Sequence, residues 1–189
     1  MNLKRNLMKL PHKILELSEH QKFMGVAGGR GDFREKELLE VVVGLGRKYR
    51  VLVQAFDARA IAGIRHLVHA VALCLAARSH GEKIARSQEI DLLCWTAGER
   101  QIEVAVKKVG VKAKSPVVIV AVGREVERIR KAMREIFLKS GLQEDPGVIE
   151  MSQEKVGKIK EAFGIKDEEL ICPVEKIVLE KIALLEVQL

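Results

Sequence analysis

The chain has 189 residues, of which 48% are hydrophobic and 31% are charged, and its formal net charge is +7. This length and composition are typical of one compact domain that buries a substantial core. Because a run of about eighteen apolar residues is needed to cross a bilayer and none occurs, the sequence predicts no membrane-spanning helix.

The basic and acidic residues are distributed unevenly along the chain. Residues 1–139 contain 27 Lys and Arg against 15 Asp and Glu, whereas residues 140–189 contain 6 against 11. A basic body is typical of a protein that faces a polyanion. A heat-adapted charged surface without any ligand would give the same composition, so charge alone does not decide between the two.

The N-terminal segment, residues 1–22, is predicted to be an extension in front of a domain that spans residues 23–189. Its apolar residues follow a helical spacing, which predicts a surface helix or a frayed tail: Leu3, Leu7, Leu10, Ile14 and Leu17. A short strand is expected around Val26, followed by a glycine-rich turn at Gly28–Gly31. The next helix is expected from Phe33 to Val43, ended by Gly44 and Gly46.

A buried strand is expected at Val51–Phe56, and Asp57 is placed to cap the helix that follows. That helix carries an apolar face from Ile61 to Leu75 and should stop at Gly81. Residues 81–110 then read as two amphipathic helices broken at Gly98, with Gly110 ending the second in a positive-φ conformation. The expected inward stripes are Ile90, Leu93, Cys94 and Ala97 in the first, and Ile102, Ala105, Val106 and Val109 in the second.

The remainder alternates strands and helices. A β-branched strand at Val117–Val122 precedes a helix from Glu125 to Leu138 that Gly141 ends, and a short strand is expected at Val148–Met151. Two more helices are predicted, one from a Ser152 cap to Gly164 and one opened by Pro173; residues 183–189 fit either a helix or a strand. The fold class is therefore α/β (α+β), a small mixed sheet packed with about seven helices in a single compact domain.

Catalytic and metal-binding patterns are weak in this sequence. Gly28–Gly31 matches neither the phosphate-loop motif nor the dinucleotide fingerprint, so a turn is favoured. His66 and His69 lack a third ligand at a suitable spacing, and Asp57 with His66 is better explained as a helix cap and a helix-surface imidazole than as an acid–base pair. We therefore expect no catalytic residue, no metal and no cofactor, and a protein that binds rather than transforms.

The three cysteines, Cys74, Cys94 and Cys172, have no paired spacing. Each lies on or near an apolar face, which predicts buried free thiols. Free thiols are usual in a reducing compartment, and this favours a cytoplasmic protein.

A basic cluster surrounds the predicted helix pair. Its members are Lys83, Arg86, Arg100, Lys107, Lys108, Lys112 and Lys114, with Gln101 beside them. Such residues neutralise phosphates, and planar Arg and Gln side chains can meet the base edges of an unpaired strand. Because Trp95 is the only nearby aromatic, a short single-stranded target suits the cluster better than a stacking platform; a solvated helix face is the alternative for each residue.

Four segments of this chain resemble one family in order and in spacing. They are Phe23–Gly29; Val51–Ala58 with His66-Leu67-Val68-His69-Ala70; Ile84-Ala85, Leu92-Leu93 and Gly98–Ala105; and Val178–Val187. Together they resemble the PRPK-binding-protein family, the small non-catalytic, kinase-binding subunit of the KEOPS (EKC) tRNA-modification complex. Asp91, where that family usually carries Glu, and Cys94-Trp95 depart from its pattern but keep the side-chain class.

The resemblance implies a specific set of partners and a role. The partners would be the PRPK/Bud-type kinase-like ATPase, tRNA and, indirectly, the catalytic threonylcarbamoyl-transfer subunit. The chain would hold the 3′ single-stranded end of tRNA and support formation of threonylcarbamoyladenosine (t6A) without activity of its own. The implied tRNA contacts are Arg100, Gln101, Lys83, Arg86, Lys107 and Lys108. The alternatives are a small enzyme that binds a nucleotide at Gly28–Gly31, and a generic RNA-binding module.

Overall fold

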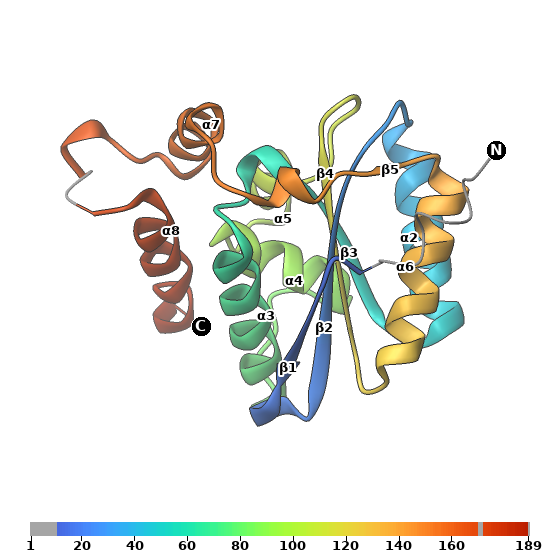
Figure 1. Cartoon of the computed structure of the whole chain (residues 1–189). Helices are drawn as coiled ribbons and strands as arrows, with labels where there is room; N and C mark the ends of the chain where they lie inside the picture. The colour runs from blue at the N-terminus through green and yellow to red at the C-terminus, as the bar shows by residue number, and fades with distance from the viewer. Residues whose placement is uncertain (1–10, 170–171, 189) are drawn as a thin grey trace.

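A five-stranded antiparallel sheet forms the centre of the computed structural model, which describes residues 11–169 and 172–188 (Figure 1). The strands are β1 (Lys13–Leu17), β2 (Lys22–Arg30), β3 (Leu52–Asp57), β4 (Val117–Gly123) and β5 (Gln143–Glu144). Their order is β1-β2-β4-β3, and β5 pairs with the far end of β2 at Gly29 and Arg30. The central pairing is therefore made by strands that lie far apart in the sequence.

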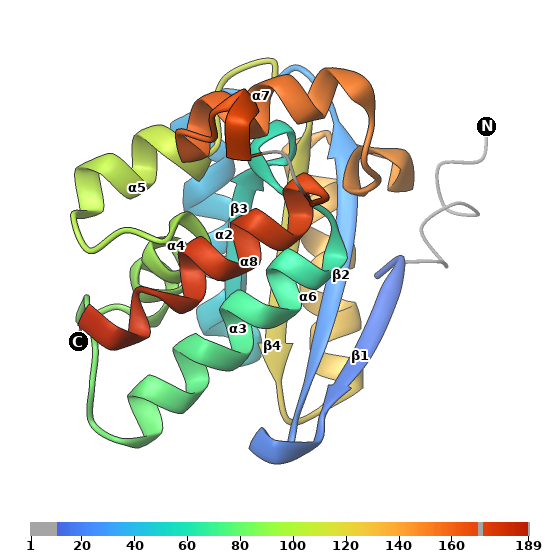
Figure 2. The same ribbon diagram turned by 90° about the vertical axis from the view of Figure 1, so that its left-hand side faces the viewer.

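Helices cover both faces of this sheet. On one face lie α2 (Glu35–Tyr49) and α6 (Val126–Ser140), as Figure 1 shows. On the other face lie α3 (Ile64–Ser79), α4 (Gln88–Ala97), α5 (Ile102–Val109), α7 (Gln153–Phe163) and α8 (Val174–Ala183). Figure 2 shows α8 lying alongside α3 on the outer side of this layer, with α5 and α7 at the same end of the molecule.

Strand β4 explains why there are two separate cores. Its residues are all buried, and successive side chains of a strand point to opposite faces. Val118, Val120 and Val122 belong to the core under α3 and α4, whereas Ile119 and Ala121 belong to the core under α2 and α6. A continuous apolar run, rather than an alternating one, is what a strand covered on both faces requires.

The predicted single α/β domain is confirmed, with seven α-helices within the described ranges. The strands at Val26, Val51–Phe56 and Val117–Val122 are present, although every pairing is antiparallel where a mixed sheet was expected. Helices α4, α6 and α7 end in left-handed glycines, with φ values of 63° at Gly98, 70° at Gly141 and 59° at Gly164.

The prediction for the N-terminal segment is wrong where the structure describes it. Residues Lys13–Leu17 form β1, an edge strand that pairs with β2 from Lys13 opposite Val26 to Leu17 opposite Lys22. Leu17 is buried in the core beside Met24. The segment from residue 11 onwards therefore belongs to the sheet and is not a separate extension; residues 1–10 lie outside the described part.

Two predicted glycine stops are also wrong. Helix α2 continues past Gly44 and Gly46 to Tyr49, because Leu45 and Gly46 pack inward, and the helix ends only at left-handed Arg50. Gly46 instead permits close packing, since a Cβ there would lie 3.1 Å from the carbonyl oxygen of Val51. Gly110 ends α5, but with φ at −64° it does so in an extended rather than a left-handed conformation.

Two further local predictions need correction, and one open alternative is decided. Asp57 caps the short 3-10 turn Ala58–Ala60 by accepting a hydrogen bond from the Arg59 N–H, and α3 begins only after Gly63. No strand forms at Val148–Met151: Val148 and Ile149 belong to the 3-10 turn Pro146–Ile149, and Glu150 caps it. Near the chain end, where a helix and a strand were both open, Glu186–Gln188 forms a 3-10 turn.

Candidate functional site

The six residues predicted to bind tRNA do not gather at one place. Lys83 and Arg86 are exposed in the loop before α4, whereas Arg100 and Gln101 are exposed in the turn after it. Because a ten-residue helix is about 15 Å long, α4 separates these two pairs by roughly that distance. The remaining two residues, Lys107 and Lys108, lie in the last turn of α5 and line a cavity.

Lys108 is held in place by contacts within the protein. Its side chain is only 14% exposed, and its ammonium group donates hydrogen bonds to the Ala97 carbonyl at 3.0 Å and to Glu99 Oε1 at 2.7 Å. The same group lies 4.7 Å from the centre of the Phe163 ring, a cation–π distance. Lys108 therefore joins α4, α5 and α7, and it contributes positive charge to the cavity from a fixed position.

The loop that presents Lys83 and Arg86 is anchored by a buried carboxylate. Asp91 is 0% exposed and accepts hydrogen bonds from Arg78 Nη1 at 2.5 Å and from the Ile84 N–H at 3.0 Å. Arg78 also donates to the carbonyl of Ala85 at 3.2 Å. Asp91 therefore ties the end of α3 to the start of α4. It is the residue that stands where the family named above usually carries the longer Glu.

A first cavity of about 340 Å³ lies between α5, α7 and the 3-10 turn that follows β3. Four basic side chains besides Lys108 line it: Arg59, Lys107, Lys112 and Lys158. Asp57 and Glu161 are the acidic residues of its lining, and Ala60, Val104 and Ala162 supply apolar surface. The cavity therefore combines an excess of positive charge with aliphatic walls.

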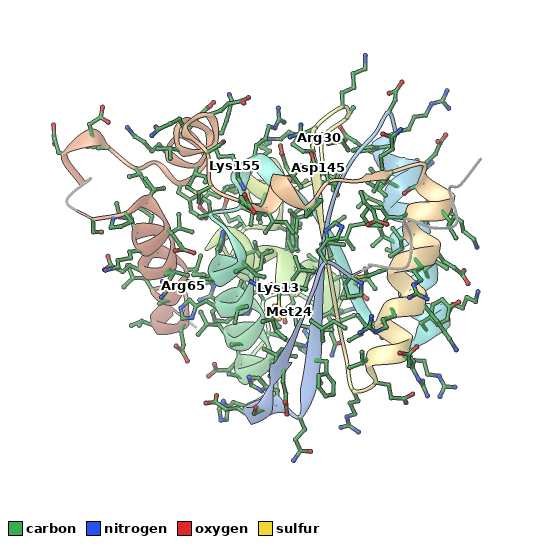
Figure 3. All side chains as sticks on the ribbon, in the orientation of Figure 1. Lys13, Met24, Arg30, Arg65, Asp145 and Lys155 are labelled. Atoms are coloured by element: carbon green, nitrogen blue, oxygen red, sulfur yellow. The ribbon has the colours of Figure 1, made fainter. Side chains whose placement is uncertain are left out.

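A second cavity of about 200 Å³ adjoins the first between β2, the 3-10 turn at Pro146–Ile149 and the start of α7. Arg59 and Lys158 line both cavities. Arg30 borders the second cavity and pairs with Asp145 at 2.5 Å, and Figure 3 shows these two side chains together where β2 ends.

Asp57 determines how Arg59 is oriented between the two cavities. The Asp57 side chain is 2% exposed and accepts from Arg59 Nε at 3.0 Å and Nη2 at 2.7 Å. Such bidentate pairing is geometrically specific, and it raises the pKa of the guanidinium further. Lys112 Nζ lies 3.9 Å from the same carboxylate. One buried acid thus holds two cations at the rim of the cavities.

Lys155 is a buried cation that the sequence reasoning did not identify. Its residue is 8% exposed, and its ammonium group donates to the carbonyls of Val148 at 3.0 Å and Ile149 at 3.4 Å. Burial lowers the pKa of Lys155 to about 8, while the negative charge of Asp57 opposes that shift. Figure 3 shows Lys155 at the start of α7 beside the second cavity, which it helps to line.

His66, one of the two histidines considered above as metal ligands, lies in the interior of the protein. His66 is fully buried, which contradicts its expected place on a helix surface, and burial lowers its pKa to about 4. Its ring bonds to the Ala62 N–H at 3.1 Å and to the Thr96 carbonyl at 2.8 Å, so it has a structural role. Across the described residues, no group of three or more His, Cys, Asp or Glu side chains is arranged to hold a metal ion.

Gly28 and Gly29 do not form the predicted turn, because both lie within β2. A Cβ on Gly28 would lie 2.5 Å from the Asp145 carbonyl oxygen, and one on Gly29 would lie 2.8 Å from a ring carbon of Phe137. These glycines therefore permit close packing against neighbouring segments. The geometry required for a phosphate-binding turn at Gly28–Gly31 is not present, and this removes the structural basis for the nucleotide-binding alternative.

Part of the apolar stripe predicted for α5 faces solvent. Ala105 and Val109 are buried as expected, but Ile102 is 43% exposed and Val106 is 46% exposed. Exposed apolar side chains are most informative when several share one helix, as they do on α5.

Among the cysteines, Cys74 and Cys94 are buried free thiols as predicted, whereas Cys172 is half-buried. Within the described part of the chain, no helix has the length and apolar character needed to cross a bilayer.

Sequence reasoning missed Arg59 and Lys158, which connect the two cavities. The only local signal was the Asp57-x-Arg59 spacing, in which an acid at the end of a strand can hold an Arg two residues later. Lys158 lies about a hundred residues further along the chain, and only the packing of α7 against the turn after β3 brings it to the same place.

Comparison with known proteins agrees with the resemblance seen in the sequence. Residues 35–186 match the family described as "Kinase binding protein CGI-121". A curated relative, the "Regulatory protein Cgi121" of Methanocaldococcus jannaschii, is 30% identical over 147 residues, which cover 78% of this chain and 89% of the relative. The match spans the strands β3 to β5, the helices α2 to α8, the whole lining of the first cavity and all of the second cavity's lining except Arg30. The chain therefore belongs to the CGI-121 family of kinase binding proteins.

Proposed function

We propose that this protein is a non-catalytic regulatory subunit that binds a kinase-like ATPase and the 3′ single-stranded end of tRNA. The kinase partner is supported by the family to which the chain belongs and by the name of its archaeal relative. In this proposal the protein is a subunit of the KEOPS complex, which forms t6A in tRNA and acts in the cytoplasm. The chain has no catalytic activity of its own and meets the threonylcarbamoyl-transfer subunit only through the complex.

The observation that carries the tRNA part is the pair of cation-lined cavities beside α5 and α7. Lys107, one of the proposed tRNA contacts, opens directly onto the larger cavity. Arg100 and Gln101 lie at the other end of α5, about 12 Å away for a helix of eight residues. A nucleic-acid strand that follows α5 would therefore meet both groups of side chains, and its phosphates would be neutralised along the way.

The kinase part is supported by apolar surface that the fold leaves uncovered. Ile102 and Val106 of α5 are each more than a third exposed, and Leu184 beyond the end of α8 is 59% exposed. Apolar groups of this kind are commonly buried when two proteins associate. Holding the kinase and one end of tRNA together would raise the effective concentration of the distant anticodon arm at the catalytic subunit.

Co-purification tests this function directly. The full chain is captured from its host, and both proteins and RNA in the eluate are identified. Recovery of a kinase-like ATPase together with tRNA is the expected result. RNA without such a protein would favour the generic RNA-binding module, and recovery of neither would contradict the proposal. A purified kinase-like partner should also hydrolyse ATP faster when this chain is added, whereas the chain alone should hydrolyse none.

A further inference from the structure

Helix α2 turns a strip of apolar and charged side chains toward solvent. Its buried side chains, Leu38, Val42 and Leu45, pack into the core that α2 shares with α6. Its outward face forms a shallow hollow that we call the α2 strip, lined by Lys36, Leu39, Glu40, Val43, Gly44 and Arg47. Residues three and four positions apart lie on one face of a helix, so this strip is continuous. Leu39 is 39% exposed and Val43 is partly exposed, which leaves apolar surface available for a contact.

Gly44 is not required by packing within the described part of the chain. A Cβ there would meet no atom of another described segment within 4 Å, whereas one on Gly46 would lie 3.1 Å from the Val51 carbonyl oxygen. Glycine is less favourable than alanine in the middle of a helix, but it allows another helix to approach closely. Gly157 of α7 is equally uncrowded. The residues one turn away from it, however, are all polar: Gln153, Glu154, Lys160 and Glu161.

The charges of the α2 strip are arranged to complement a second copy of the same helix. Glu40 lies about one turn before the Val43–Gly44 pair and Arg47 about one turn after it, and both are exposed. If two α2 helices cross antiparallel at this pair, each Glu40 lies level with Arg47 of the other copy, about 5 Å along the axis from the crossing. A parallel crossing would instead place like charges together. Lys36 lies about 11 Å from the crossing, where crossed helices have begun to diverge.

We infer that two copies of this chain pair through the α2 strip in an antiparallel arrangement. Val43 of each copy packs beside Gly44 of the other, and Glu40 of each copy pairs with Arg47 of the other. The contact is isologous, as in most protein dimers. Because it centres on a single helix, it buries less than the roughly 1,200–2,000 Å² of a standard interface, and its dissociation constant should be micromolar.

This pairing goes beyond the proposed function and does not depend on it. Figure 1 shows α2 on one side of the sheet and α5, α7 and α8 on the other. The surfaces proposed for the kinase and for tRNA therefore stay accessible in the dimer. A complex that contains the dimer would carry two kinase-like subunits, related by the same two-fold axis.

Sedimentation equilibrium of the isolated full chain, over a range of micromolar concentrations, tests the inference. The average mass should rise with concentration from the chain mass of 21.1 kDa toward twice that value. Gly44→Gln places a long uncharged side chain at the crossing and should weaken pairing by at least about tenfold. Gly157→Gln is the matched control and should leave pairing unchanged. Both variants replace a helix glycine by a better helix former, so neither should unfold at a lower temperature than the unchanged protein.

Charge reversal tests the antiparallel register. Arg47→Glu faces Glu40 of the other copy at both ends of the contact, so it should weaken pairing by about tenfold. Combining Arg47→Glu with Glu40→Arg exchanges the two signs and should restore the dissociation constant to within about threefold of the original. Lys176→Glu makes the same change of charge at an exposed position of α8 and should have no effect.

The outcomes separate this inference from the proposed function. If the unchanged protein keeps a mass of 21.1 kDa at every concentration, the inference is wrong. If it dimerises but Gly44→Gln and Arg47→Glu have no effect, the copies pair elsewhere and the role of the α2 strip is wrong. If Gly44→Gln leaves the mass unchanged and abolishes capture of the kinase-like partner, the strip binds that partner: the inference then fails, while the proposed function stands.

Discussion

Protonation of His66 should weaken the fold in mildly acidic solution, because this residue is buried as a neutral ring. The Ala62 N–H can only donate, so Nδ1 accepts its hydrogen bond and Nε2–H donates to the Thr96 carbonyl, at 3.1 Å and 2.8 Å respectively. The ring also contacts Phe163 edge-on at 5.6 Å between centroids. A proton on Nδ1 would face the Ala62 N–H directly and break that bond, and α3, α4 and α7 meet at this point.

The magnitude follows from the two pKa values. Burial lowers the pKa of His66 from 6.5 to about 4 in the folded protein. Between these values the unfolded chain binds a proton that the folded protein does not, so the contribution is complete above about pH 6.5 and is lost as pH falls toward 4. At 1.36 kcal/mol per pKa unit the full loss is about 3 kcal/mol, of which about 1.4 kcal/mol is already lost at about pH 5.5.

Urea unfolding at pH 7.5, 5.5 and 4.5 measures this loss (approximate set points chosen to bracket the range). Carboxylates also titrate there, so the informative quantity is the difference between the unchanged protein and His66→Gln. His66→Gln should be less stable at the highest pH by about 1–3 kcal/mol, and that difference should shrink as the solution becomes acidic. His69→Gln, on the next turn of α3, serves as the control. A difference that stays constant across the three pH values would refute the reasoning.

Three further results are expected. Asp91→Ala should lower the free energy of unfolding by about 3–5 kcal/mol, because it leaves Arg78 without its buried partner; a urea midpoint near that of the unchanged protein would contradict this. Gly29→Ala should cost about 1–3 kcal/mol in the same assay, since the new methyl group would lie 2.8 Å from Phe137, and an equally stable variant would show that the ring can move aside. Arg100→Glu should weaken tRNA binding in a filter assay and leave the kinase complex intact on gel filtration; unchanged tRNA affinity at moderate salt would count against a contact at this turn.

The features that were predicted correctly are those that local sequence determines. The strand at Val117–Val122 is a β-branched run, and the helix ends at Gly98, Gly141 and Gly164 need residues that tolerate positive φ. Ser152 caps α7 by accepting from the Lys155 N–H as expected. Each of these signals acts within a few residues, so the surrounding fold does not override it.

The features that were missed depend on tertiary packing. The leucine spacing near the N-terminus resembles a helix, but pairing with β2 makes Lys13–Leu17 a strand. Gly28 and Gly29 suggested a turn, although their purpose is to let Asp145 and Phe137 approach β2 closely. Burial of His66 likewise depends on α4 and α7, which lie elsewhere in the sequence.

The candidate site divides in the same way. The sequence indicated the positive charge near α5 and therefore Lys107, because clustering of Lys and Arg is visible without a structure. It did not indicate Arg59 or Lys158, which the fold brings to the cavities from two other segments. It also treated Lys108 as an available ligand, since a Lys that bonds to the Ala97 carbonyl looks the same in sequence as a solvated one.

The position of β4 determines when this chain can fold during synthesis. Strand β4 lies between β2 and β3 and pairs with both. These two earlier strands do not pair with each other, so only β4 joins them into one sheet. A ribosome must therefore translate beyond Gly123 before β3 gains any ladder of backbone hydrogen bonds, and before β2, which can already pair with β1, gains its second one. Folds built on such non-local contacts form slowly, and the nascent N-terminal half exposes unpaired strand edges until then.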